Sequence, residues 1–172
     1  QARYICEPLR RWDYCLVNDG AACLILTTAA RARSLKKAPV YVLGLEGIHG
    51  GRQEFVFGQP GLGVQQQDVL AYRPDPKNQR SFQMADVQPK DINALYTYDA
   101  FSYNVWVALE RHGFCKPGEA AGFTQGGRIG LGGKLPMNTS GGLLSEAHLE
   151  GWGNHMEIVR QLRGECGARQ VN

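Results

Sequence analysis

One histidine lies where the backbone is best able to approach a bound molecule. His148 belongs to NTSGGLLSEAHLEGWG, residues 138–153, between a glycine-rich turn and a helix expected over 150–164. Gly141 and Gly142 allow the backbone to come close to a ligand. Free N–H groups at a helix start can hold an anion or a developing oxyanion. An imidazole at this turn could therefore transfer a proton or hold a substrate oxygen.

A second candidate is the phenol of Tyr98 in YDAFS. Tyr98 and Asp99 stand where an expected strand over 91–101 gives way to a helix. A phenol has an ordinary pKa of about 10 and becomes an acid or base when its surroundings tune it. In open α/β sheets ligands bind beyond the carboxyl ends of the strands. Tyr98 and His148 are therefore expected to face one shared cavity.

Each candidate also has a structural interpretation. His148 could cap a helix or bond to backbone, and Tyr98 could be a core aromatic on a strand. Asp99 is expected to be the N-cap of the helix that follows it, a position that aspartate favours. Asn138 and Ser140 are expected to bond to the backbone of their own turn, although with Gly141 and Gly142 they are also the candidate substrate-binding residues. The flanking glycines are expected to have no packing purpose, which favours a functional role for the histidine.

The alternation of strand-like and helix-like segments predicts an α/β fold with helices layered on a sheet. Strands are expected at 23–28, 39–47, 91–101 and 134–140, and helices at 29–37, 101–113 and 150–164. Glycine-rich surface loops are expected at 49–67 and 116–133, and 68–90 is ambiguous, with room for a short helix. No apolar strand follows the last helix. The sheet is therefore expected to be unfinished, and the chain to be part of a longer polypeptide or an assembly.

The two longer helices carry apolar stripes at helical spacing. The expected buried residues are Phe101, Val105 and Leu109 on the first helix and Trp152, Met156, Val159 and Leu162 on the last. Gly113 is a suitable C-terminal stop for the first helix. His112 stands in its last turn, where a cation suits the helix dipole, so a structural role is favoured there. His155 is expected to pack on its helix.

Composition excludes several classes of partner. The net charge is +3 over 172 residues, and lysine and arginine are scattered, so no nucleic-acid partner is expected. The densest basic cluster is interpreted as a solvated helix face and consists of Arg31, Arg33, Lys36 and Lys37. No apolar run approaches the roughly 20 residues of a membrane span. The five cysteines form no CxxC pair, and neither they nor the four histidines have metal-ligand spacing, so we expect no metal site and a reducing, cytoplasmic location.

Three segments in this order resemble the thiolase superfamily. NTSGGLLSEAH with QLRGECGARQV is similar to the carboxyl-terminal half, VNDGAACLIL resembles the segment that ends the amino-terminal half, and YDAFS resembles the Asn-Glu-Ala-Phe or His-Asp-Cys-Phe motif. SEAHLEG resembles the Gly-His-Pro motif, with His148 at the histidine and Leu149 in place of the proline. The branch most similar is that of the sterol carrier protein thiolases and the lipid-transfer thiolase-like proteins.

The resemblance implies a thiolase-like layered α/β fold that is only partly present. Residues 1–37 would end the amino-terminal half, and 38–172 would form the carboxyl-terminal βαβ half without its final strands. It also implies a CoA thioester as substrate, no separate cofactor and a homo-oligomer. Tyr98 stands where thiolases have asparagine or histidine, which resembles the acyl-CoA aldolases that shorten steroid side chains. Those enzymes work with a small zinc-binding OB-fold partner, so such a partner is possible here.

Three functions follow from the residues and the resemblance. The first is retro-aldol cleavage of a β-hydroxyacyl-CoA, with Tyr98 in proton transfer and His148 holding the thioester oxygen or sharing the proton, or with these roles exchanged. The second is a thiolase or acyltransferase, in which His148 activates a cysteine supplied by the other half. The third is a non-catalytic thiolase-fold subunit. The retained histidine and its glycine turn count against the third.

Overall fold

The computed structural model describes residues 2–46 and 79–171. The chain forms two units, each described by itself. The larger consists of Gln1–Tyr41, Ile92–Glu110 and Cys115–Asn172, and the smaller of Val42–Asp91 and Arg111–Phe114. The loop predicted at 49–67 lies outside the described residues.

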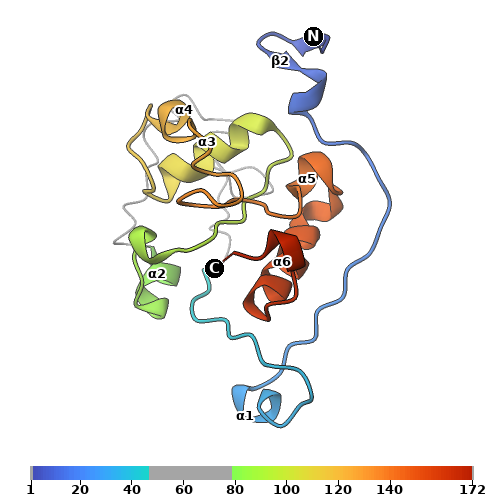
Figure 1. Cartoon of the computed structure of the whole chain (residues 1–172), viewed down its shortest axis with the longest axis vertical. Helices are drawn as coiled ribbons and strands as arrows, with labels where there is room; N and C mark the ends of the chain where they lie inside the picture. Colours follow the sequence, from blue (N-terminus) through green and yellow to red (C-terminus); the bar gives the residue numbers. More distant parts are fainter. Residues whose placement is uncertain (1, 47–78, 172) are drawn as a thin grey trace, which may run out of the picture. The chain divides into compact units, whose positions relative to one another are not determined.

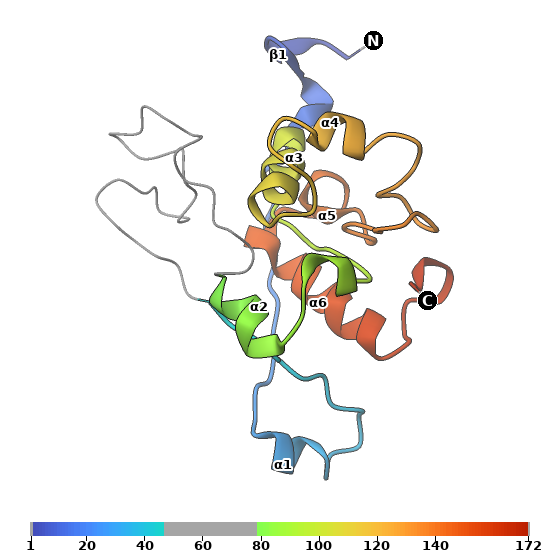
Figure 2. The ribbon, with the colours of Figure 1, turned by 90° about the vertical axis from the view of Figure 1, so that its left-hand side faces the viewer.

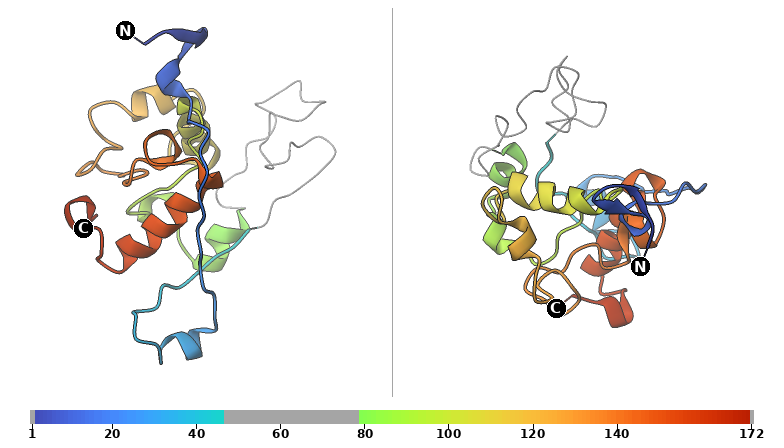
Figure 3. Two further views of the ribbon diagram at one scale, coloured as in Figure 1. Left: turned by 90° about the vertical axis from the view of Figure 1, so that its right-hand side faces the viewer. Right: turned by 90° about the horizontal axis from the view of Figure 1, so that it is seen from above.

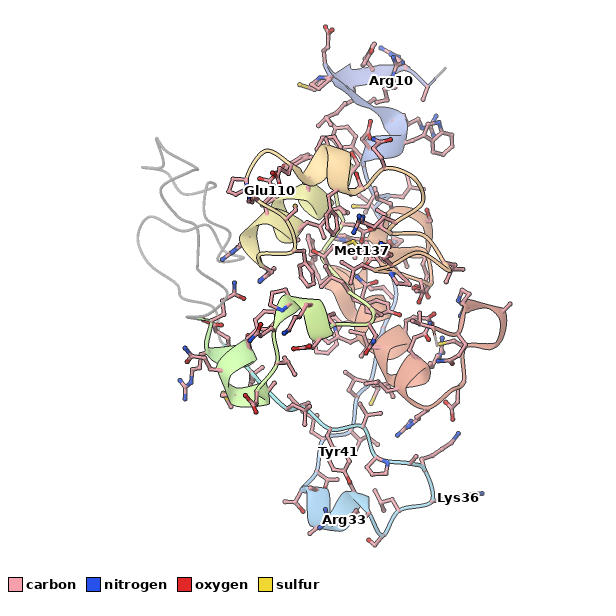
Figure 4. All side chains as sticks on the ribbon, turned by 60° about the vertical axis from the view of Figure 1, so that its left-hand side comes forward. Arg10, Arg33, Lys36, Tyr41, Glu110 and Met137 are labelled. Atoms are coloured by element: carbon pink, nitrogen blue, oxygen red, sulfur yellow. The ribbon has the colours of Figure 1, made fainter. Side chains whose placement is uncertain are left out.

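The larger unit begins with a short hairpin. Strands β1 (Tyr4–Cys6) and β2 (Leu9–Arg10) pair antiparallel, with Tyr4 opposite Arg10, and the 3-10 helix η1 (Arg11–Asp13) follows (Figure 1). The guanidinium carbon of Arg10 lies 3.8 Å from the ring centre of Tyr4, a cation–π arrangement on the exposed hairpin (Figure 4).

Helices make up most of the regular structure in the larger unit. They are α1 (Ala29–Ala32), α3 (Ser102–Arg111), α4 (Ala120–Phe123), α5 (Gly142–Ser145) and α6 (Trp152–Leu162), with 3-10 turns η4 (Leu149–Gly151) and η5 (Gly167–Arg169). The helices predicted at 101–113 and 150–164 are confirmed. As expected, Gly113 follows α3 in the left-handed region, at φ +74°.

Helix α4 lies beside α3 (Figure 2). The indole nitrogen of Trp106 donates to Oγ1 of Thr124 at 3.2 Å, and Oε1 of Glu110 accepts from the backbone N–H of Gly118 at 2.8 Å. These contacts fold the segment predicted as one glycine-rich loop at 116–133 back onto the helix, and α4 forms within it.

The basic cluster is exposed, as predicted. Helix α1 stops at Ala32, so the helix predicted over 29–37 is shorter than expected, and Thr28 caps its start by accepting from the N–H of Arg31 at 3.3 Å. Arg33 and Lys36 project from this turn (Figure 4). This basic cluster is therefore a solvated surface of the larger unit.

The smaller unit contains α2 (Arg80–Ala85) and η3 (Pro89–Asp91). Gln79 is buried, and its side chain donates to the carbonyl oxygen of Arg111 at 3.3 Å and lies 2.9 Å from Nδ1 of His112. Burial lowers the pKa of His112, and the charge of Arg111 lowers it further. His112 is structural, as expected, but the interpretation as a helix-terminal cation is corrected, because burial favours the neutral ring.

The strands predicted at 23–28 and 39–47 do not form among the described residues. Both segments lack regular secondary structure in their described residues and are largely exposed: Ile25 is 88% exposed and Leu43 64% exposed. A strand needs a neighbour for its backbone N–H and C=O groups, and neither segment pairs with another within 2–46 and 79–171. Hydrophobicity alone therefore misidentified these residues as buried strands.

The strands predicted at 91–101 and 134–140 are reduced to a single parallel bridge. Leu95 pairs with Met137. The N–H of Leu95 donates to the carbonyl oxygen of Pro136 at 3.0 Å, and its carbonyl oxygen accepts from the N–H of Asn138 at 3.1 Å. The two segments are therefore adjacent and parallel, as an α/β arrangement requires. At the end of the 91–101 segment, Phe101 forms an isolated antiparallel bridge with Tyr14.

The buried face of α6 differs from the predicted stripe. Trp152 is 48% and Leu162 67% exposed, whereas Gly153, Asn154 and Glu157 are buried. Glu157 is 1% exposed and accepts bonds from Thr139 at 3.0 Å and from the guanidinium of Arg169 at 3.1 and 3.3 Å. A buried carboxylate persists when it is paired and hydrogen-bonded, so a polar network under α6 replaces the expected apolar contact.

The first long helix follows its predicted stripe more closely. Leu109 is completely buried, and Phe101 and Val105 are half-buried. The aromatic ring of Phe101 packs edge-on against Tyr14, with ring centres 5.2 Å apart. The start of α3 is therefore tied to the segment that leaves the hairpin.

Candidate functional site

The phenol of Tyr98 and the imidazole of His148 meet, as predicted. The Tyr98 hydroxyl lies 2.6 Å from Nε2 of His148, and the rings are arranged edge-on with centres 5.7 Å apart. Tyr98 comes from the extended segment after the Leu95–Met137 bridge, and His148 immediately precedes η4. A bond of this length between two titratable groups allows a proton to pass between them.

Two asparagines hold the backbone beside Tyr98. The Asn138 side chain accepts from the N–H of Thr97 at 2.9 Å and donates to its carbonyl oxygen at 3.1 Å. Asn154 of α6 donates to the same carbonyl at 2.8 Å. Asn138 thus bonds to backbone, as expected, but to the neighbouring strand-like segment instead of its own turn. This clamp fixes the residue next to the phenol.

The segment NDGAA, residues 18–22, binds the backbone of His148. The backbone N–H of His148 donates to Oδ1 of Asn18 at 2.8 Å. Gly20 lies against Leu149 so closely that a Cβ at Gly20 would be 2.5 Å from Cδ2 of that leucine. The segment carrying this motif passes the start of α6 (Figure 3). Contacts from a distant part of the sequence therefore fix the turn that carries His148.

A third polar side chain, Glu150, joins the pair and was missed in the sequence. Its Oε2 accepts from the Tyr98 hydroxyl at 3.1 Å, and its Oε1 lies 3.8 Å from Nδ1 of His148. Burial, followed by the hydrogen bond and charge of Glu150, raises the pKa of Tyr98 to about 12. The phenol therefore keeps its proton at neutral pH. A carboxylate two residues after the motif histidine was the available signal.

Asp99 caps a helix, but not the one predicted. Its Oδ1 accepts from the N–H of Leu143 at 2.8 Å, in the first turn of α5. Asp99 is 4% exposed. Gly142, at φ +62°, lies so close to this carboxylate that a Cβ would collide with it. The expected N-cap of α3 is thus corrected: the aspartate joins the Tyr98 segment to the glycine turn before His148.

Ser140 differs from the other predicted substrate-binding residues. Its hydroxyl is buried and makes no hydrogen bond within the described part of the chain, as is true of Oδ1 of Asn154. Asn138 is engaged with Thr97, and Gly141 and Gly142 form the left-handed turn into α5. Ser140 is therefore the member of the set whose side-chain oxygen is buried without a hydrogen bond to the described residues.

Within residues 2–46 and 79–171, no cluster of three His, Cys, Asp or Glu side chains could hold a metal ion. None of the helices in this part is long and apolar enough to cross a membrane. His155 packs against Trp152, with ring centres 5.2 Å apart, and its Nδ1 lies 3.1 Å from the carbonyl oxygen of Gly151, which agrees with its expected packing role.

Comparison with known proteins identifies the family. Residues 64–172 match the family model described as thiolase C-terminal domain-like. The chain belongs to this family. A solved structure titled Ltp2–ChsH2(DUF35) aldolase superimposes with a TM-score of 0.85 at 32% identity, covering 99% of this chain and 44% of that one. The thiolase-like fold expected from the motifs is thereby supported.

Curated relatives include enzymes of two reaction types. This thiolase-like chain is 37% identical to 17-hydroxy-3-oxo-4-pregnene-20-carboxyl-CoA lyase of Mycobacterium tuberculosis, over 95% of the chain and 41% of the relative. It is 34% identical to the steroid side-chain-cleaving aldolase of Thermomonospora curvata, with the same coverage of 95% and 41%. Acetyl-CoA acetyltransferase of Methanothermobacter thermautotrophicus is 33% identical over 97% of the chain and 42% of its own length. The chain thus spans less than half of these relatives.

Proposed function

We propose that this chain supplies the proton-transfer residues of an acyl-CoA carbon–carbon lyase that cleaves a β-hydroxyacyl-CoA by a retro-aldol reaction. The observation that carries the proposal is the 2.6 Å contact between the Tyr98 hydroxyl and His148 Nε2. The lyase and aldolase named among the relatives support the reaction type and a steroid side chain as the acyl group.

In the proposed reaction the Tyr98 oxygen takes the proton of the β-hydroxyl group. The bond between the α and β carbons breaks, its electron pair forms the thioester enolate, and the β carbon becomes a carbonyl. The phenol releases its own proton to a neighbouring acceptor as it takes the new one, and the hydrogen bond between His148 Nε2 and the phenol oxygen supports this exchange. This bond favours a part in proton transfer over the other expected role of His148, which was to hold the thioester oxygen.

The glycine turn before α5 is the proposed binding site of the thioester group. The Ser140 hydroxyl is buried and has no bond to the described residues, so a substrate oxygen would complete its hydrogen bonding. Asn138, Gly141 and Gly142 shape the turn around it. Donors aimed at an enolate oxygen supply a large part of such catalysis, and CoA enters as substrate, with no separate cofactor.

Partners and organisation are also proposals. The matched solved structure, the Ltp2–ChsH2(DUF35) aldolase, names a second component, ChsH2(DUF35), beside Ltp2. We infer that this chain works with a small partner of the zinc-binding OB-fold type, in a cytoplasmic homo-oligomer. Residues 1–37 would belong to the amino-terminal thiolase half and 38–172 to the carboxyl-terminal half, with the layered sheet completed outside this chain.

The second candidate function is thiolytic acyl transfer, favoured by the acetyl-CoA acetyltransferase among the relatives. It requires a nucleophilic cysteine at the thiolase position of the amino-terminal half. In that reaction His148 would activate the cysteine, and the Tyr98 hydroxyl would be peripheral.

One assay separates the two functions. The full-length natural protein, with its partner, is given a steroid β-hydroxyacyl-CoA or, separately, a β-ketoacyl-CoA with free CoA, and the products are identified by chromatography. Release of a ketone or aldehyde with a shortened acyl-CoA from the first substrate supports the lyase. Thiolysis of the second substrate without cleavage of the first would rule the lyase out.

A further inference from the structure

Glu150 occupies an unusual position on the Tyr98–His148 contact. Its two carboxylate oxygens face the two partners separately: Oε2 lies 3.1 Å from the phenol oxygen, and Oε1 lies 3.8 Å from Nδ1 of the imidazole. Its backbone is left-handed at φ +50°, and so is that of Leu149 at φ +36°. Residues with side chains seldom adopt this conformation, and it persists where the surroundings enforce it, often at functional sites.

The surroundings that enforce it come from the NDGAA motif. Asn18 accepts from the backbone of His148 at 2.8 Å, and Leu149 packs onto the bare backbone of Gly20. Gly151 continues the left-handed run at φ +81°. The turn is therefore held at both its start and its middle, and the carboxylate of Glu150 returns over the phenol instead of extending away from it.

The number of protons at this contact limits its arrangement. The phenol carries one proton but faces two groups that can accept it. A carboxylate can only accept, so a Tyr98 proton directed at Glu150 leaves the phenol oxygen to accept from Nε2–H of His148. The other ring nitrogen, Nδ1, lies 3.8 Å from Oε1 on the opposite side of the ring. Both hydrogen bonds of the phenol are satisfied when they run from His148 to Tyr98 and from Tyr98 to Glu150.

We propose that Glu150 is a positioning residue that directs this chain of hydrogen bonds and takes up the proton that Tyr98 releases during the reaction. The inference rests on the proposed retro-aldol function. As the phenol oxygen receives the proton of the substrate β-hydroxyl, its own proton moves to Oε2 of Glu150, which becomes a neutral acid. The electron pair of the broken carbon–carbon bond enters the enolate. Return of the proton to the enolate carbon restores the carboxylate, so no proton or electron is lost.

The charges around the phenol agree with this arrangement. His148 and Glu150 both contact the Tyr98 hydroxyl. Burial raises the pKa of this phenol, and the hydrogen bond and charge of Glu150 and the charge of Cys15 raise it further. Burial also raises the pKa of the Cys15 thiol. A phenol that resists ionisation must release one proton as it receives another, and the neighbouring carboxylate provides the acceptor.

The test compares Glu150→Gln with Glu146→Gln in the full-length natural protein with its partner. Glutamine keeps the length and an accepting oxygen but removes the charge and the capacity to store a proton. Glu146, also exposed, lies four residues earlier at the end of α5, and its substitution removes one carboxylate from the same region. Three readouts are collected: the ¹⁵N resonances of the His148 ring, the ultraviolet titration of Tyr98 identified by difference from Tyr98→Phe, and turnover of the β-hydroxyacyl-CoA.

In the unsubstituted protein the His148 Nε2 resonance is expected to be that of a protonated nitrogen. Glu150→Gln is expected to move the Tyr98 titration to lower pH, shift the ¹⁵N resonances of the His148 ring, and lower turnover by roughly 10²-fold or more, within the range for proton transfer. Glu146→Gln is expected to change none of these. Unaltered titration and ring resonances in Glu150→Gln overturn the inference, even if cleavage is seen. Absence of cleavage by the unsubstituted protein instead overturns the proposed function and the reaction step with it, while shifted spectra would still establish the hydrogen-bond direction.

Discussion

The phenol oxygen of Tyr98 lies 2.6 Å from Nε2 of His148, although 50 positions separate the two residues in the sequence. Neither residue is placed by its own element alone. Asn138 and Asn154 fix the backbone next to the phenol, and Asn18 fixes the backbone of the imidazole. The contact between these two half-buried polar side chains therefore depends on four converging segments of the chain.

Removal of the Tyr98 hydroxyl is expected to affect turnover and not folding. Tyr98→Phe keeps the ring and its edge-on contact with His148 but deletes the oxygen that both partners bind. Retro-aldol turnover should fall by roughly two to four orders of magnitude, the range for a general acid or base, with CoA affinity nearly unchanged. Steady-state cleavage of a β-hydroxyacyl-CoA by the full-length protein measures this. Turnover near that of the unsubstituted protein would remove Tyr98 from the mechanism and favour acyl transfer.

Substitution of His148 is expected to have a different signature. His148→Ala removes the hydrogen bond between the imidazole and the Tyr98 phenol, which should lower turnover by roughly two to three orders of magnitude, within the range for proton transfer. Because its backbone N–H still binds Asn18, the turn should remain folded. The Tyr98→Phe, His148→Ala double variant provides the control: if the pair acts as a unit, its loss of turnover will be much smaller than the product of the two single losses. Multiplicative losses would indicate independent roles.

Gly142 is expected to be far less tolerant than another left-handed glycine. At Gly164, φ is +69° and a Cβ would meet no atom within 4 Å, so Gly164→Ala should cost only the conformational strain of about 1–2 kcal/mol. At Gly142 the same strain applies, and the methyl group would also displace the Asp99 carboxylate from the Leu143 N–H. Loss of that charged bond should add about 1.5–3 kcal/mol. Urea unfolding of both variants measures the difference, and equal losses would contradict the role given to Asp99.

The sequence predicted the positions that local chemistry determines. The glycine that ends α3, the two longer helices and the convergence of Tyr98 with His148 all follow from spacing, turn residues and motif order. Asp99 was recognised as a capping residue, but its helix was misassigned, because a side chain at a strand end can bind any N–H that the fold brings near. Nothing in the local sequence places α5 beside it.

Segments whose structure depends on distant partners were not predicted. CLILTT at 23–28 has the composition of a buried strand, but Ile25 and Leu26 are exposed at 88% and 84%, because no described segment pairs with it. On α6 the apolar spacing of Trp152 and Leu162 suggested the buried face, whereas Thr139 and Arg169 draw Glu157 inward instead. Glu150 was missed for a related reason: its side chain reaches the phenol only because Leu149 and Glu150 are left-handed, and no residue type signals that conformation.

The buried Glu157 is expected to make the stability of the fold sensitive to acid. Burial raises the pKa of this carboxyl, but the hydrogen bonds from Arg169 and Thr139 outweigh burial, so that the folded-state pKa is lower than the ordinary value. A carboxyl with a lowered folded-state pKa stabilises the fold above its unfolded-state pKa of about 4.3. That stabilisation is lost as the pH falls through the folded-state value. The free energy of unfolding should therefore decrease on acidification, and Glu157→Gln should reduce this dependence.

In Arg169→Met the burial effect is opposed only by the hydrogen bonds with Thr139 and Cys166. The pKa of Glu157 should therefore rise, the protein should be less stable at neutral pH, and the slope with pH should weaken or reverse. Lys37→Met, which breaks the exposed pair with Glu165, is the matched control and should leave the contribution of Glu157 intact. Urea unfolding between pH 3 and pH 7 measures all four proteins, and an unchanged slope in Arg169→Met would show that the guanidinium does not hold this carboxylate in its charged form.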